Sequence, residues 1–226
     1  MLKENLEKVF SEISKGNNLG EPVTLVGATK MVDAEIINQA VALGLKVVAE
    51  NKVQEFNLKH DKIVGASQHF IGHLQTNKVK YLVGNVDVIQ SVDTVHLASA
   101  IDVQAQKKGV IQDVLLEVNA GGEISKSGFS IEQVLDSAKE IANNFKSIKI
   151  KGLMAMLPHS DDKELLIDLC SKMRRIYDKL NEDGFNLTYL SMGMSNDYEL
   201  AVQHGSNMIR LGTKIFGKRN YSNEVK

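Results

Sequence analysis

Two hydrophobic patterns alternate along this chain, and their alternation limits the folds that the chain can adopt. Short runs rich in Val, Ile and Leu, typical of buried strands, alternate with longer segments whose apolar residues recur at helical spacing. The pattern predicts strands at Thr24–Ala28, Lys46–Ala49, Gln68–Ile71, Asp87–Ser91, Asp113–Asn119, Lys149–Met156, Leu187–Met192 and Met208–Leu211. It predicts helices at Leu2–Ser14, Asp33–Leu43, Thr94–Lys107, Ile131–Asn144, Asp161–Asn181 and Asp197–His204.

Strand and helix alternating in this way over about 200 residues favours the α/β class and a (β/α)₈ barrel. The first predicted helix precedes the first strand and is an extra N-terminal element. An open doubly wound sheet is the main alternative, but it usually carries a glycine-rich nucleotide motif after its first strand. The turn here reads Gly27-Ala28-Thr29-Lys30, without that motif, and no Walker P-loop occurs. Because no linker or repeat interrupts the pattern, we expect a single domain over residues 1–226.

Charge and cysteine content exclude several classes of protein. The net charge of −1, from 27 basic and 28 acidic residues, gives no footprint for nucleic acid or an anionic membrane. The single cysteine, Cys170, excludes an internal disulfide framework and a cysteine-based zinc site, and we expect it to pack as a small hydrophobe on a helix face. The sequence shows no signal peptide and no bilayer-spanning run, so we expect a cytoplasmic protein.

Lys30 follows the first predicted strand, at a place where a lysine needs a reason. Its amine could simply reach solvent from the end of the strand. Alternatively, partial exclusion of water disfavours the charged form of an amine, lowers its pKa and makes it a better nucleophile. Such a lysine can form a Schiff base with an aldehyde. Taken alone, Lys30 does not decide between these interpretations.

The other strand ends bring polar groups to the same place, since barrel chemistry gathers at the C-terminal ends of the strands. These ends offer amides, hydroxyls and one arginine, without a close carboxylate pair suited to glycoside hydrolysis. The six histidines lack a metal-binding spacing. His69 and His73 are near each other in sequence, but a turn separates them, and we interpret both as packing or loop residues.

The turns after the last two predicted strands are candidates for binding phosphate, as barrels often do there. Ser195 precedes a helix expected to begin near Asn196, whose free N–H groups could face an anion. Gly212 and Thr213 offer a backbone that an anion can approach closely, together with a hydroxyl. Without a ligand, the same geometry would make Ser195 a helix N-cap and Gly212 a tight turn, so both interpretations stay open.

Arg210 carries a permanent charge into an apolar strand and must find an acceptor there. That acceptor is either an acidic neighbour or a ligand. An amine, a phosphate cradle and a buried cation together suit a ligand that has an aldehyde, a phosphate and a ring nitrogen. Pyridoxal 5′-phosphate has this set of groups and is the predicted cofactor.

Several blocks, in order, resemble the pyridoxal phosphate homeostasis proteins, from about Thr24 to Tyr221. The blocks are Gly27-Ala28-Thr29-Lys30, Ala49-Glu50-Asn51-Lys52-Val53-Gln54-Glu55, His69 to Lys78, Ser125-Lys126-Ser127-Gly128, Gly152 to Met156, Ser191-Met192-Gly193-Met194-Ser195 and Arg210 to Gly217. The family's second block usually begins Gly-Glu-Asn. Ala49 replaces that glycine here and leaves Glu50 and Asn51 in place, so only a small local adjustment is expected.

The resemblance implies a barrel similar to the N-terminal domain of alanine racemase, with pyridoxal phosphate in a Schiff base on Lys30. It also implies that Ser195 and the Gly212-Thr213 turn hold the phosphate, with a backbone contact from Met194. It further implies that Arg210 faces the pyridine nitrogen and that Asn51 lies near the ring. The implied task is intracellular pyridoxal phosphate homeostasis, by storing, buffering or delivering the cofactor to apo-enzymes.

Two classes of function compete, a carrier and an amino-acid racemase-like enzyme. Racemases of this fold take a second catalytic base from an added β-domain and complete their site across a dimer. The chain ends soon after the eighth predicted strand, which favours a monomeric carrier without robust catalysis. Lys126 or Tyr198 could supply a second acid or base, but the sequence places neither one. A Schiff-base aldolase ranks last, because such enzymes usually carry their lysine on a later strand.

Overall fold

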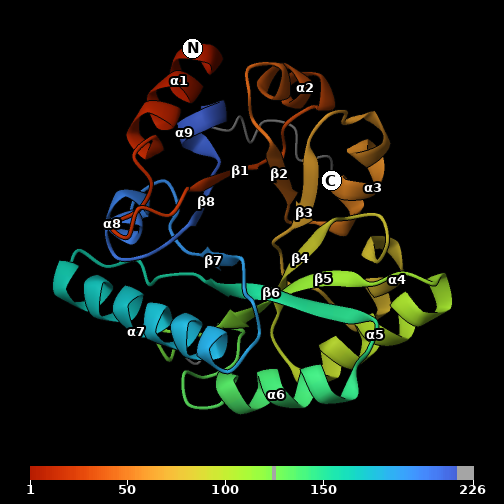
Figure 1. The fold of residues 1–226 in the computed structure, drawn as a ribbon. Helices are drawn as coiled ribbons and strands as arrows, with labels where there is room; N and C mark the ends of the chain where they lie inside the picture. The colour runs from red at the N-terminus through yellow and green to blue at the C-terminus, as the bar shows by residue number, and fades with distance from the viewer. Residues whose placement is uncertain (124–125, 218–226) are drawn as a thin grey trace.

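Eight parallel strands close into a barrel in the computed structural model, which describes residues 1–123 and 126–217 (Figure 1). Each strand pairs with the next along the chain, and β8 pairs with β1. The strands are β1 (Thr24–Ala28), β2 (Val47–Glu50), β3 (Ser67–Phe70), β4 (Val88–Val92), β5 (Gln112–Val118), β6 (Ile148–Ala155), β7 (Tyr189–Ser191) and β8 (Met208–Leu211). All eight predicted strands therefore form, and the predicted barrel is confirmed. Ser125 and Tyr221, both within the resemblance, lie outside the described residues.

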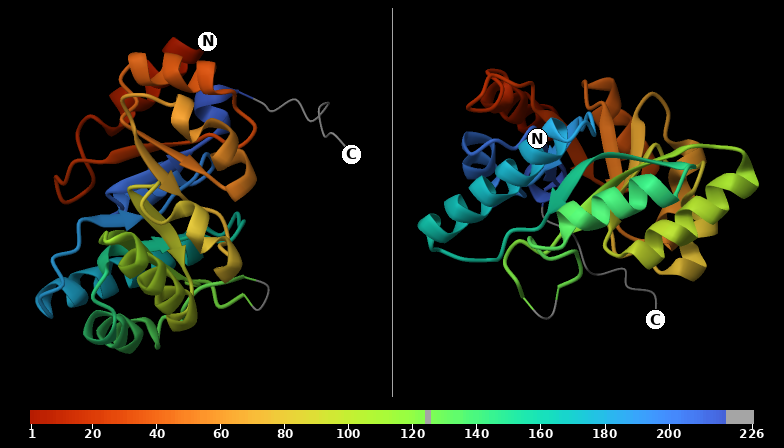
Figure 2. Two further views of the ribbon diagram at one scale, coloured as in Figure 1. Left: turned by 90° about the vertical axis from the view of Figure 1, so that its right-hand side faces the viewer. Right: turned by 60° about the horizontal axis from the view of Figure 1, so that its bottom comes forward.

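Helices surround the barrel in both views of Figure 2. They are α1 (Leu2–Ile13), α2 (Ala34–Ala42), α3 (Val53–Lys59), α4 (Val79–Leu82), α5 (Val95–Lys108), α6 (Val134–Asn144), α7 (Lys163–Glu182), α8 (Tyr198–Gln203) and α9 (Thr213–Phe216). Two 3₁₀ turns, η1 (His60–Lys62) and η2 (Thr76–Lys78), complete the described elements. The sequence pattern did not predict α3, α4 and α9, because four to seven residues are too short to show a helical period.

The extra N-terminal helix packs against the other end of the chain. Figure 1 shows α1 beside α9, and the side-chain amide of Asn5 donates to the Ile215 carbonyl over 3.0 Å. The buried face of α1 presents Leu6, Val9 and Ile13 to a cluster that also contains Ile215. This contact joins the segment before β1 to the segment after β8, on the side where the barrel closes.

Side chains fill the interior of the barrel. Because side chains alternate across a strand, every second residue points inward. The apolar ones form a compact cluster of Val26, Val47, Ala49, Val88, Leu115, Met154 and Met208. Their neighbours on each strand point outward and pack under the helices. Cys170 is fully buried on α7 within the outer cluster, as predicted.

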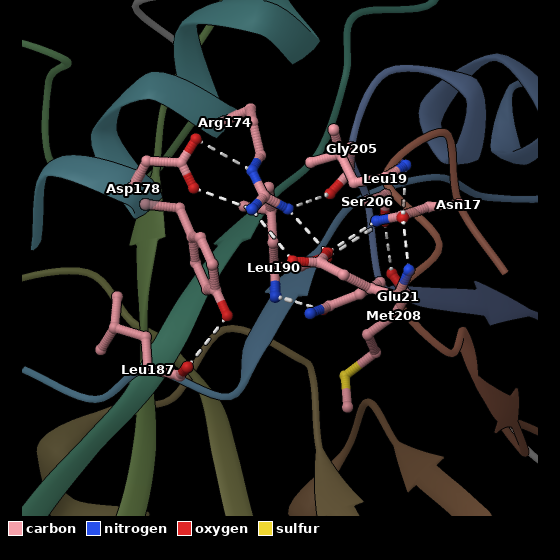
Figure 3. Close-up of polar contacts among 12 residues, drawn as sticks. Asn17, Leu19, Glu21, Arg174, Asp178, Leu187, Leu190, Gly205, Ser206 and Met208 are labelled. Atoms are coloured by element: carbon pink, nitrogen blue, oxygen red, sulfur yellow. Dashed lines mark hydrogen bonds and ion pairs between the residues drawn. The ribbon is translucent and has the colours of Figure 1, made fainter. Parts of the chain in front are cut away.

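A charged cluster ties the N-terminal end of the barrel together, as Figure 3 shows. The Arg174 guanidinium on α7 donates to both carboxylate oxygens of Glu21, over 2.7 and 3.0 Å. It also donates to Asp178 and to the Gly205 carbonyl. Asn17 donates to Glu21 over 2.7 Å. The bond from Arg174 holds the pKa of Glu21 below its usual range. Segments preceding β1 and β8 are thus fixed to α7, at the end of the barrel opposite the strand C-termini.

We expect Arg174→Ala to destabilise the protein by about 1–3 kcal/mol, since it leaves a partly buried carboxylate without its charged donor. Equilibrium urea unfolding would measure this loss. Arg175→Ala is the matched control, because Arg175 is the exposed next residue of the same helix. Equal midpoints for the two variants would contradict a stabilising role for the cluster.

Candidate functional site

The predicted site residues line one cavity of about 620 Å³, formed mainly by segments that follow the C-terminal ends of strands. They are Lys30, Asn51, Met194, Ser195, Arg210, Gly212 and Thr213. The connection from β6 to α7 also lines the cavity, through Met156, Leu157, Pro158, His159, Ser160 and Asp161. Sequence reasoning did not select this connection. The polar residues after Pro158, following a strand end, are the signal that could have found it.

Lys30 lies two residues after the end of β1 and is half-buried. Strand β1 pairs with β8 in a register that sets Val26 opposite Arg210 and Gly27 opposite Leu211. The lysine and the arginine therefore reach the cavity from neighbouring strands. Among the described residues, the Lys30 amine forms neither a hydrogen bond nor an ion pair, so it remains available to a ligand.

Asn51 enters the cavity from the segment after β2. Its N–H donates to the Glu50 carboxylate over 3.2 Å. Gly72 approaches the Asn51 carbonyl so closely that a Cβ at position 72 would lie 1.9 Å from that oxygen. Only glycine permits this approach. Ala49, which departs from the family pattern, is buried within β2 and pairs with both neighbouring strands, opposite Ala28 and His69.

The two candidate phosphate turns meet at their hydroxyls. Thr213 Oγ1 donates to Ser195 Oγ over 3.2 Å. The N–H groups of Ser195, Asn196 and Gly212 make no hydrogen bond within the described residues. The N–H of Met194, by contrast, donates to Asp197 Oδ1 over 2.5 Å. The donors free for an anion in these turns thus include the Ser195 hydroxyl and three backbone N–H groups.

The first of these turns differs from the predicted helix start. Helix α8 begins at Tyr198 with Asp197 as its N-cap, so Ser195 lies before the cap. The chain reverses at Gly193, whose φ of +98° favours glycine, and whose Cβ would meet Tyr198 at 2.8 Å. The Gly193 carbonyl accepts the Arg210 N–H over 3.0 Å. This bond couples the Ser195 turn to the strand that carries Arg210.

Arg210 is buried and finds acceptors within the protein. Its Nη1 donates to the carbonyl of Ser191 over 2.8 Å and to the Ser191 hydroxyl over 2.7 Å, and its Nη2 donates to the Ala155 carbonyl over 3.0 Å. No acidic side chain among the described residues forms an ion pair with it. Burial lowers the pKa of Arg210 to about 10, against the opposing charge of Glu117. Its Nε makes no hydrogen bond to a described residue, which leaves a donor on a side chain that lines the cavity.

A chain of hydrogen bonds runs from Arg210 into the barrel. Arginine can only donate, so the Ser191 hydroxyl accepts a hydrogen bond from Arg210. The same hydroxyl donates a hydrogen bond to Gln90 Oε1 over 2.8 Å. The Gln90 amide nitrogen lies 2.9 Å from His69 Nδ1. His69 Nδ1 is then an acceptor, and the ring is neutral with its hydrogen on Nε2. Burial agrees with this state, since it lowers the pKa of His69 to about 4.

A pair of buried acids lies at the ends of β4 and β5. Glu117 and Asp93 are both at least nine-tenths buried. Burial, with the nearby Asp93 charge, raises the pKa of Glu117 to about 7. His73 is exposed and lies 3.3 Å from the Asp93 carboxylate. The two histidines were interpreted as packing or loop residues, and in the structure His69 packs inside the barrel whereas His73 is exposed in a loop.

The two candidate second bases lie away from the cavity lining. Tyr198 is buried beneath α1, where its hydroxyl donates to Glu12 and accepts from Lys214 over 3.2 Å. Lys126 forms an ion pair with Glu123 over 2.6 Å. Neither residue is among those that line the cavity. Within residues 1–123 and 126–217, no group of three His, Cys, Asp or Glu side chains is placed to hold a metal ion.

Comparison with known proteins gives the family. The alanine racemase N-terminal domain family matches residues 5–220. A pyridoxal phosphate homeostasis protein of Aquifex aeolicus is 40% identical over 221 residues, which cover 96% of this chain and 95% of that protein. The chain belongs to the pyridoxal phosphate homeostasis protein family. The family predicted from the sequence blocks is thereby confirmed. A further member, from Schizosaccharomyces pombe, is 33% identical over 95% of this chain and 91% of its own length.

Solved structures show the same fold. PipY of Synechococcus elongatus, solved with pyridoxal phosphate bound, has a TM-score of 0.84 and 28% identity, covering 96% of this chain and all of that one. Alanine racemase of Clostridium difficile has a TM-score of 0.81 and 17% identity, covering this whole chain and 58% of the racemase. At that identity the racemase supports the barrel fold alone. No helix in the described part of this family member is long and apolar enough to cross a bilayer.

The pKa of His69 predicts how stability changes with pH. An unfolded histidine binds a proton near pH 6.5, whereas folded His69 does so only near pH 4. Between these values the unfolded state holds more protons, so stability is lost as pH falls through this window, by up to about 3 kcal/mol.

Urea unfolding of wild type and His69→Gln at pH 4.5, 5.5 and 7 would measure this contribution, and we expect the stability of wild type relative to the variant to fall as the pH falls from 7 to 4.5. Glu117 acts in the opposite direction in both proteins and cancels in the comparison. The exposed His96→Gln serves as control. Parallel pH profiles for wild type and His69→Gln would contradict a buried neutral His69.

Proposed function

We propose that this protein binds pyridoxal 5′-phosphate in the cavity and holds it on Lys30, as a carrier that stores, buffers or delivers the cofactor. One observation carries the proposal: a free amine, two paired hydroxyls and a buried guanidinium line the same cavity. The relatives named as pyridoxal phosphate homeostasis proteins and the PipY structure with bound cofactor support it.

The residues present fit the group. When bound, pyridoxal phosphate supplies an aldehyde that a lysine amine can attack, a phosphate dianion and a pyridine nitrogen. The cavity volume of about 620 Å³ is within the ordinary range for sites of small ligands. The donor set contains one amine for the aldehyde, and hydroxyl and backbone donors for an anion. These are the groups that such a ligand requires.

Each residue has a distinct task in this proposal. The Lys30 Nζ forms the Schiff base, and the aldehyde oxygen leaves as water with two protons from the amine. Ser195, Thr213 and the free N–H groups of their turns hold the phosphate, since charge-assisted hydrogen bonds to anions are strong. The Arg210 cation faces the pyridine nitrogen and disfavours its protonation. Asn51 borders the ring. Met194 belongs to the turn that carries Ser195, and its N–H donates to Asp197 Oδ1.

A carrier is favoured over a racemase by the positions of the candidate bases. Racemisation needs an acid or base on each face of the substrate. Lys30 can serve one face, but Tyr198 and Lys126, the two residues considered for the other, do not line the cavity. We therefore propose a carrier. We further propose that it is monomeric and cytoplasmic, and that its recipients are the apo forms of pyridoxal phosphate enzymes.

Lys30→Ala should abolish covalent attachment of the cofactor. Purified wild type mixed with pyridoxal phosphate should show the visible absorption band of a Schiff base, and borohydride should fix the mass of the cofactor on the peptide that contains Lys30. Lys46→Ala, an exposed lysine before β2, should behave as wild type. An unchanged band in Lys30→Ala would overturn the assignment.

Loaded protein should not exchange or invert amino acids at catalytic rates, because Tyr198 and Lys126, the two residues considered as the second acid or base, do not line the cavity. The measurement incubates loaded protein with single enantiomers of alanine in deuterated water and follows deuterium at the α-carbon and the appearance of the opposite enantiomer. Inverted, deuterated product over many turnovers would favour the racemase instead.

A further inference from the structure

The turn that carries Lys30 is held from outside by three charged side chains. We infer that Lys59, with Glu50 and Glu55, is a positioning device that directs the Lys30 amine into the cavity. This inference rests on the proposed function, because the step that it assists is attachment of the cofactor to Lys30.

Lys59 is a buried lysine whose amine is fully used. It lies at the end of α3, with only a tenth of its side chain exposed. Its Nζ lies 2.5 Å from Glu50 Oε1, and it donates to the Thr29 carbonyl over 2.8 Å and to the Val32 carbonyl over 3.1 Å. These three contacts satisfy its three donors. Lys59 thus joins the carbonyls on either side of Lys30 to one fixed point.

The two glutamates hold the same turn. Glu50 Oε1 accepts the Thr29 hydroxyl over 2.6 Å, and its Oε2 accepts the N–H of Asn51. Glu55 Oε2 accepts the Met31 N–H over 2.7 Å and lies 3.7 Å from Lys59 Nζ. Every residue of the turn from Thr29 to Val32 except Lys30 is therefore bound to this charged group, and Lys30 alone is left free.

The backbone at Met31 shows what the device does. Met31 has a φ of +59°, a left-handed conformation that is unfavourable for a residue with a long side chain. Neighbouring residues of the turn line two adjoining cavities: Lys30 lines the candidate site, whereas Met31 and Val32 line a second cavity of about 640 Å³ with Glu55 and Lys59. The bond to Glu55 holds Met31 in this conformation, and with it the direction of Lys30.

Loss of the device should slow the covalent step without weakening noncovalent binding. In that step the Nζ lone pair of Lys30 forms the bond to the aldehyde carbon, and the carbonyl oxygen leaves as water. Misplacement of an attacking atom by about 1 Å costs up to ~10²-fold in rate. The phosphate donors lie on the turns after β7 and β8, and among the described residues they form no hydrogen bond with Glu50, Glu55 or Lys59, so binding through them should survive.

Two probes separate these effects. Pyridoxal 5′-phosphate reports the rate of attachment by stopped-flow absorbance, and pyridoxine 5′-phosphate, which lacks the aldehyde, reports noncovalent affinity by calorimetry. We expect Glu55→Ala to lower the attachment rate at least about tenfold and to leave the pyridoxine phosphate affinity within about twofold of wild type. Glu55→Gln keeps an oxygen acceptor for the Met31 N–H and should restore most of the rate.

Lys59→Met should show the same selective loss, with Lys62→Met as its matched control on an exposed neighbour. Since Lys59→Met leaves Glu50 buried without its partner and can unfold the protein, the Glu55 pair keeps the test decisive. In the protein without cofactor, the Met31 amide should exchange with deuterium faster in Glu55→Ala than in Asn57→Ala, an exposed change on the same helix.

Unchanged attachment rates in folded Glu55→Ala would overturn the inference, as would an equal loss of both probes. Failure of the wild-type protein to attach pyridoxal phosphate would instead overturn the proposed function, and this inference with it. Selective loss of the attachment rate, together with rescue by glutamine, supports the inference.

Discussion

Hydrogen bonds between β1 and β8 close the barrel, and the candidate site depends on that closure. Parallel pairing in register sets Val26 opposite Arg210, so the segment that follows β1 and the segment that follows β8 form adjoining parts of one wall. Lys30 and the Gly212-Thr213 turn extend from these segments into one cavity. The packing of α1 against α9 and the Arg174 cluster at the opposite end reinforce the same junction. The candidate site at the C-terminal ends of the strands thus depends on the contact between the first and the last strand of the barrel.

Burial explains how charge is distributed around the site. A buried polar group must find a partner, and most of those near the cavity do so within the protein. Lys59 is satisfied by Glu50 and by two carbonyls, and Arg210 by Ser191 and Ala155. Lys30 differs, since its amine has no partner among the described residues. Lys59 therefore has a structural role, whereas the Lys30 amine is left free. A carrier that holds its ligand through a covalent bond requires such a free amine.

The eight strands could be predicted because parallel strands are buried on both faces and appear as continuous apolar runs. Their boundaries differ from the predicted ones by a few residues at most, since hydrogen bonding and not hydrophobicity sets the last paired residue. Helix α6 begins at Val134, one turn later than the predicted Ile131, because Ser130 to Gln133 form a turn first. Helices α3, α4 and α9 are too short to show a period, yet α3 carries Lys59 and Glu55.

By itself, the sequence determined the order of strands and helices, and with it the positions that follow each strand. Parallel strands around a barrel all end on one side, so residues after the strands had to gather there, and the seven predicted site residues share a cavity for this reason. Only the tertiary structure decided which polar groups meet. The link from His69 through Gln90 and Ser191 to Arg210 crosses four strands, and Lys59 reaches Thr29 from a helix that the pattern did not predict. Such contacts depend on strand register and on the direction of each side chain, which no local pattern of residues contains.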